Sequence, residues 1–238
     1  MNNTVIILVL LLMSTMYAIY KMYKSDVNQK NFIVCVYLYI LLSLFFVSII
    51  SQYTATLSIT DSQNVGKMVI TYFILAFSGL CLIYNDDIFV NHFGLLLLCI
   101  SLGLTIGVTY RNSKNISYAL MLTSIIVFTF TMIAFNSNES QLLSFKSWIP
   151  KLTSLLCVII MIELLYFAFY GRNENFNTIM SGTVVLVFVA FILSDTSKLI
   201  LDSNSLSCQV HSCINYPKRV VNLLLDYINI FVRLNSNK

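Results

Sequence analysis

Long apolar runs dominate this sequence and restrict it to one kind of fold. A helix needs about 20 apolar residues to cross a bilayer. Only helices and closed barrels satisfy their backbone hydrogen bonds within lipid, so repeated runs of this length predict an all-α integral membrane protein with short loops and no soluble domain. The runs lie at residues 4–20, 32–51, 68–84, 93–110, 117–135, 152–170, 178–201 and 218–234.

The composition supports a membrane protein and argues against nucleic acid as a partner. Hydrophobic residues make up 58% of the 238 residues and charged residues only 10%, against about 25% charged residues in a soluble domain. The formal net charge of +4 is spread over the loops, without the clustered basic face that nucleic acid requires. Membrane lipid is therefore an expected partner, and nucleic acid is not.

The first apolar run is interpreted as a retained helix, because no basic residue precedes it and no small-x-small cleavage site follows it. A cleaved segment or one lying on the membrane surface remains the alternative. The three lysines of residues 21–30 place the following loop in the cytosol by the positive-inside rule. We expect an N-terminal hydrophobic helix with its basic cytosolic linker at 1–31, a transmembrane domain at 32–234 and a short tail at 235–238.

Three acidic residues lie inside apolar runs. Asp195 is in FILSDTSKLIL, Asp226 in VVNLLLDYINIFVRL and Glu163 in VIIMIELLYF. A carboxylate at the bilayer centre costs about 2.5–3.5 kcal/mol on insertion scales, so by default it is a functional group facing the bundle interior. The alternative is structural: Asp195 ends its span beside Lys198, Asp226 makes hydrogen bonds, and Glu163 pairs with a polar neighbour.

Helical spacing places Asp226 in a narrow polar stripe. Asn222, Asp226, Asn229 and Arg233 follow at i, i+4, i+7 and i+11 on an otherwise apolar helix, and such a stripe is expected to face protein or a water-filled cavity rather than lipid. Interhelical hydrogen bonds are the expected role of the two asparagines and the arginine. If this stripe faces the helix of Asp195, the two aspartates can meet.

These motifs resemble the transmembrane Bax inhibitor motif family, which includes Bax inhibitor, the lifeguard proteins and the Golgi anti-apoptotic proteins. In that family an Asp-Thr pair closes the penultimate span, like Asp195-Thr196 here, and the last helix carries a motif similar to LLLDYINIF at 223–231. VYLYILLSLFFVSII, GLLLLCISLGLTIG, YALMLTSIIVFTFTMIAF and SFKSW also resemble family segments. Leu102 stands where the family usually has a glutamate, and the CQVHSC insertion is unusual; these departures indicate a divergent member, and the composition permits a viral one.

The resemblance implies a seven-span bundle of Bax-inhibitor type, preceded here by the N-terminal helix. It also implies inhibition of apoptosis and a pH-sensitive calcium leak in the Golgi or the endoplasmic reticulum, with calcium as the transported ion. Asp195 and Asp226 would form the gate, because two carboxylates in contact cannot both ionise cheaply in a low-dielectric site. Glu163 would join the ion pathway. The alternatives are a scaffold that binds apoptosis regulators or a second copy of itself, and a seven-helix receptor, which the absence of prolines in the long spans disfavours.

No enzymatic activity, cofactor or bound metal is expected. The chain has two histidines, His92 and His211, and no H-E-x-x-H or G-x-G-D motif. Cys208, His211 and Cys213 form C-x2-H-x-C, which offers three soft ligands where structural zinc takes four. We therefore expect a free, solvated loop at these residues.

Overall fold

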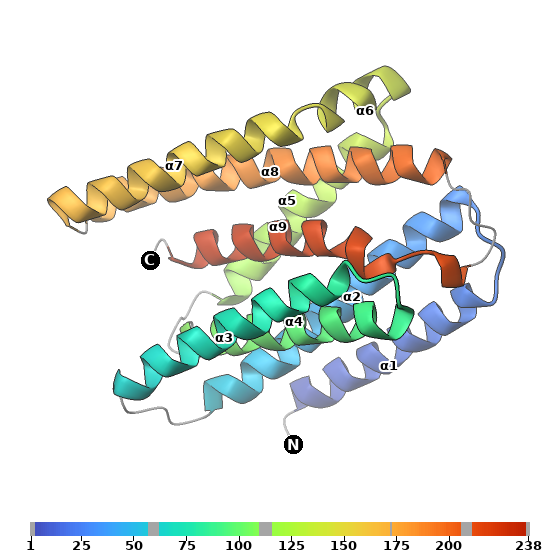
Figure 1. The fold of residues 1–238 in the computed structure, drawn as a ribbon, viewed down its shortest axis with the longest axis horizontal. Helices are drawn as coiled ribbons and strands as arrows, with labels where there is room; N and C mark the ends of the chain where they lie inside the picture. The colour runs from blue at the N-terminus through green and yellow to red at the C-terminus, as the bar shows by residue number, and fades with distance from the viewer. Residues whose placement is uncertain (1–2, 57–61, 110–115, 172, 206–210, 237–238) are drawn as a thin grey trace. The chain divides into compact units, whose positions relative to one another are not determined.

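The computed structural model describes residues 3–56, 62–109, 116–171, 173–205 and 211–236, and over these ranges it consists of helices and short connections (Figure 1). Six of the eight predicted apolar runs lie within one long helix each, run 68–84 ends one residue beyond its helix, and run 93–110 reaches Tyr110, which lies outside the described residues. The all-α fold is thus confirmed over the described residues. A short helix, α6, and a 3-10 helix, η1, were not predicted. The elements are α1 (Asn3–Tyr23), α2 (Gln29–Thr56), α3 (Ser62–Ile83), α4 (Ile88–Thr109), α5 (Ile116–Phe135), α6 (Glu139–Lys146), α7 (Ile149–Tyr170), α8 (Glu174–Asn204), η1 (His211–Cys213) and α9 (Tyr216–Ser236).

Five helical segments among the described residues are long and apolar enough to cross a membrane, which confirms a multi-pass helical membrane protein. They are Gln29–Ala55, Ile88–Thr109, Tyr118–Phe135, Glu139–Tyr170 and Glu174–Asn204. The described apolar part of α3, Ile70–Ile83, is shorter. α9 carries four charged residues, Lys218, Arg219, Asp226 and Arg233, so its composition does not by itself mark it as a span.

Local sequence signals explain several helix ends. Asn138 caps α6 through a capping box, in which its side chain accepts from the Gln141 backbone while the Gln141 side chain accepts from the Asn138 backbone. This arrangement satisfies two backbone donors that the first helical turn leaves free. Pro150 lies in the first turn of α7, where the missing N–H costs nothing, and Gly171 ends that helix with φ of 72°.

The described chain forms two compact units, and their boundary falls within α9. Unit 1 comprises Met1–Asn112 and Leu206–Leu224, and unit 2 comprises Ser113–Ser205 and Leu225–Lys238. The first part of α9 thus belongs to unit 1, and the part that begins one residue before Asp226 belongs to unit 2.

Unit 1 is built on α4, which packs closely on both α2 and α3. A Cβ added at Gly103 would lie 2.7 Å from Cβ of Ile50, and one at Gly107 would lie 2.6 Å from the backbone oxygen of Ser51, both on α2. The GLTIG stretch therefore allows close helix approach, as small residues four apart do in membrane helices.

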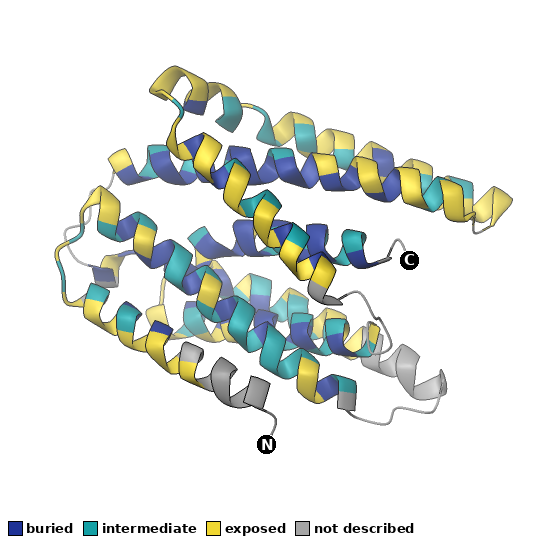
Figure 2. Ribbon diagram, turned by 180° about the vertical axis from the view of Figure 1, so that it is seen from behind, coloured by how far each residue is buried: buried dark blue, intermediate teal, exposed yellow. Residues whose placement is uncertain are grey.

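Unit 2 is built on α8, which packs against α5, α6 and α7. Figure 2 shows α8 largely buried and α7 largely exposed. The core of this unit joins buried residues of α8, from Met180 to Ile192, to Ile159 of α7 and Ile230 of α9. The exposed apolar surface of α7 is the surface expected of a helix that faces lipid.

Candidate functional site

Asp195 and Asp226 lie next to each other in unit 2. Asp195 is half-buried on α8, and Asp226 is 6% exposed on α9. Their carboxyl groups interact directly, through a side-chain hydrogen bond and through their charges. The charge of Lys198, one turn further along α8, also acts on Asp195. The two aspartates therefore meet, which the helical spacing of the α9 stripe allowed.

The surroundings of the two aspartates are apolar or already hydrogen-bonded. Ile192 and Leu199, one turn to either side of Asp195, are buried, and so is Ile230, one turn beyond Asp226. The neighbouring hydroxyls of Ser194 and Ser197 donate to carbonyls of their own helix.

Two oxygens in this region stand out. Oδ2 of Asp226 and Oγ1 of Thr196 are buried, and neither has a hydrogen-bond partner among the residues that the structure describes. Buried polar atoms are normally paired, so these two oxygens mark the region as a candidate functional site. Two adjoining carboxyl groups can hold a proton between them or offer oxygen ligands to a hard cation.

Two further contacts fix α9 within unit 2. The guanidinium of Arg233 donates to both carboxylate oxygens of Glu163 on α7, at 2.6 and 2.9 Å, and each side chain is 26% exposed. The hydroxyls of Tyr227 and Ser124 on α5 are 3.1 Å apart. Asp226 is therefore held between contacts to α5 and α7, while its own carboxyl group meets α8.

The polar stripe of α9 is only partly buried. Asn229 is half-buried like Arg233, but Asn222 is exposed, and so is Lys218 one turn earlier on the same face. This face is covered from Asp226 onward and open in the first two turns, so Asn222 does not join the buried group. The Ser124–Tyr227 contact was missed, because Tyr227 lies off the stripe and its sequence context is ordinary for a span.

The prediction of a free, solvated loop at the C-x2-H-x-C motif is wrong for His211, which is buried, and holds only in part for Cys213, which is exposed but not free. His211 is 2% exposed in η1, and Cys213 is disulfide-bonded. Cys208 lies outside the described residues. Across the residues that the structure describes, no three His, Cys, Asp or Glu side chains are arranged to hold a metal ion.

The long apolar helices define the protein as a multi-pass helical membrane protein. Two adjoining acidic side chains lie among these helices. The model of a protein family described as inhibitor of apoptosis-promoting Bax1 matches residues 29–236. The chain therefore belongs to the Bax inhibitor family, and this membership supports an anti-apoptotic membrane protein. No curated protein and no solved structure matches the chain significantly.

Proposed function

We propose that this protein inhibits apoptosis by leaking calcium from an intracellular store, and that Asp195 and Asp226 form a proton-controlled gate. The observation that carries the proposal is the direct interaction of two carboxyl groups in an apolar core, one of them with a buried oxygen that no described residue satisfies. Family membership supports the anti-apoptotic part of the proposal.

The gate follows from electrostatics. Two unit charges 4 Å apart repel by about 4 kcal/mol at an effective dielectric constant of 20. Two adjoining aspartates are therefore stabilised by one shared proton, and they titrate together rather than separately. Removing that proton leaves two negative charges that repel each other and attract calcium, for which carboxylate oxygens are suitable ligands.

The remaining polar residues have supporting roles in this proposal. Lys198 places a positive charge beside Asp195, and Asn229 adds a polar group one turn from Asp226. Glu163 is neutralised by Arg233, so it takes part in ion passage only when this ion pair opens, and otherwise it holds α9 against α7. Asn222 is exposed, so it lies outside the group of buried residues around the two aspartates.

The proposal includes seven spans from α2 to α9, without α6, preceded by α1, in the membrane of the Golgi or the endoplasmic reticulum. α9 completes the count because its charged residues inside unit 2 are matched by protein partners, which is how ionisable residues are accommodated at membrane depth. Calcium is the transported ion, and neither a cofactor nor an enzymatic reaction is involved.

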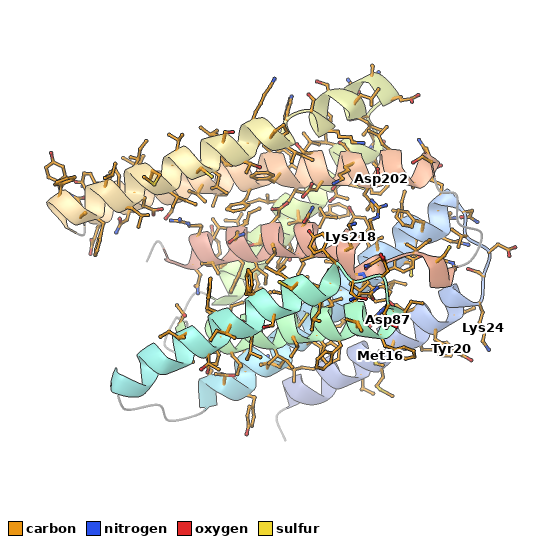
Figure 3. The ribbon with its side chains drawn as sticks, viewed as in Figure 1. Met16, Tyr20, Lys24, Asp87, Asp202 and Lys218 are labelled. Atoms are coloured by element: carbon orange, nitrogen blue, oxygen red, sulfur yellow. The ribbon has the colours of Figure 1, made fainter. Side chains whose placement is uncertain are left out.

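Measuring store content and survival in the same cells tests this function. Cells that express the protein should hold less releasable calcium and survive an apoptotic stimulus better, and Asp226→Asn should weaken both effects together. Asp202→Asn is the matched control, because Asp202 lies at the C-terminal end of α8 near Lys146, two turns from Asp195 (Figure 3). Protection with unchanged stores would contradict the leak and favour an anti-apoptotic scaffold that acts through protein contacts.

A further inference from the structure

Both histidines of the chain belong to one cluster in unit 1. Nε2 of His92, on α4, is 2.7 Å from the hydroxyl of Tyr39 on α2. The ring of Tyr39 stacks on Tyr216, the first residue of α9, with centroids 5.4 Å apart and planes 1° from parallel. The hydroxyl of Tyr216 in turn is hydrogen-bonded to Nδ1 of His211 in η1. The cluster therefore joins α2, α4, η1 and α9.

The bonds of His92 fix the direction of the hydrogen bonds at one end of the cluster. Nδ1 of His92 is 2.7 Å from the backbone oxygen of Ile88, which can only accept, so Nδ1 carries the proton. In the neutral ring Nε2 is then the acceptor, and the hydroxyl of Tyr39 donates to it.

The other end of the cluster is buried. Tyr216 is 0% and His211 2% exposed. The ring of Phe32 lies 6.0 Å from that of Tyr216, and the thiol of Cys35 is hydrogen-bonded to the Tyr216 hydroxyl. The side-chain amide of Asn215 donates to carbonyls of the turn between α3 and α4, at 2.9 and 3.1 Å. Tyr216 and Asn215 therefore dock the segment 211–216 on α2 and on the turn between α3 and α4, and His211 is buried beside Tyr216 within the segment.

We propose that the segment 211–216 is an acid-released latch, in which protonation of His211 undocks η1 from the helices of unit 1. The titratable groups packed on the cluster are Cys35 and Tyr39 from α2, His92 from α4 and Tyr216 from α9. Charged groups near this end of the unit include Asp87, which caps α4, Lys218, which lies over the ring of Tyr84 (Figure 3), and Arg219, one turn beyond Tyr216 on α9. Because Tyr216 begins α9, undocking also releases the first turn of that helix.

The sign of the effect follows from burial. Burial lowers the pKa of His211, so the docked segment binds a proton less readily than the released one. Docking is then fully favourable above the ordinary histidine pKa of about 6.5 and is lost as the pH falls below it. At about pH 5.5, one unit below that value, proton binding favours release by up to about ten-fold.

Hydrogen exchange of the purified full-length protein in lipid nanodiscs tests the latch. Protection of the 211–216 backbone, normalised to the intrinsic rate at each pH, should fall between about pH 7.5 and 5.5, by up to about ten-fold. His211→Phe retains an aromatic ring without a titrating group, and protection there should not change with pH. If that variant fails to fold, His211→Gln serves the same purpose.

The control is His92→Gln, which should keep the acid-dependent loss of protection. Unchanged protection of the wild type at the lower pH would overturn the latch. So would an acid-dependent loss that persists without His211, or one that disappears in His92→Gln.

Discussion

Asp226 and Arg233 lie two turns apart on one face of α9, yet their surroundings give them different tasks. Asp226 meets a second carboxyl group and keeps a buried oxygen without a described partner. Arg233 forms a bidentate ion pair with the carboxylate of Glu163, which is the geometry that a guanidinium favours. The first arrangement suits a group that changes its charge, and the second suits one that holds a helix in place.

The Glu163–Arg233 ion pair should stabilise unit 2 measurably. Exposed pairs contribute about 0–1 kcal/mol, whereas breaking a buried pair costs about 3–5 kcal/mol. At 26% exposure of each side chain, we expect Glu163→Gln to lower the free energy of unfolding by about 2 kcal/mol. Thermal unfolding in detergent measures this, with Lys151→Gln, an exposed charge on the same helix, as a neutral control.

A double-mutant cycle separates the ion pair from other effects. Adding Arg233→Gln to Glu163→Gln should cost little more than either change alone, because the two groups act as a pair. Strictly additive losses would show that the two side chains stabilise the protein independently.

The sequence predicted the aspartates better than it predicted their neighbours. Helical periodicity identified the face of α9 that carries Asp226, and the cost of a carboxylate in lipid directed that face inward. The sequence could not show that Glu163 lies opposite Arg233. Helical periodicity fixes the faces of a helix but not which helix packs on each face. The burial of His211 was also missed, since its partner Tyr216 reaches it only through the folded connection before α9.

At the level of elements, glycines set how closely the helices of unit 1 approach. The pair Gly103 and Gly107 was recognisable, because both residues lie in one short motif. Gly79 and Gly94 lie on different helices, and a Cβ at Gly94 would lie 2.8 Å from the backbone oxygen of Gly79. No local sequence motif predicts the contact between Gly79 and Gly94, which is seen only in the packing of α3 on α4.

Gly94→Ala should therefore destabilise the protein. The added Cβ would also lie 2.7 Å from the backbone nitrogen of Ile83, and since backbone cannot move aside cheaply, we expect a loss of about 1–3 kcal/mol. Gly182→Ala on α8 is the matched control, because nothing lies within 4 Å of its added Cβ, and it should gain about 0.5–1 kcal/mol of helix stability. Melting temperatures of both variants decide the matter: equal shifts would contradict the close contact of α3 and α4.

At the scale of the whole molecule, α1 decides the topology. If α1 spans the membrane and the loop at residues 21–30 is cytosolic, the seven further spans that we propose would place both termini on the lumenal side of the proposed Golgi or endoplasmic reticulum membrane. Epitope tags at either end should then resist protease in sealed microsomes and become sensitive after detergent. Digestion of the N-terminal tag in intact microsomes would show that α1 does not cross, and digestion of the C-terminal tag alone would rule out seven spans after α1.

In the proposed gate, Asp195 and Asp226 act as one titrating unit that controls calcium passage. Calcium flux into liposomes that contain the purified protein, measured between about pH 5 and 8, tests it most directly. The wild type should show a flux that changes with pH, both Asp195→Asn and Asp226→Asn should lose that change, and Asp202→Asn should keep it. The double mutant should resemble either single mutant, because groups that act as a unit couple by about 0.5–3 kcal/mol. A pH profile of Asp226→Asn that coincides with the wild-type profile would contradict the account.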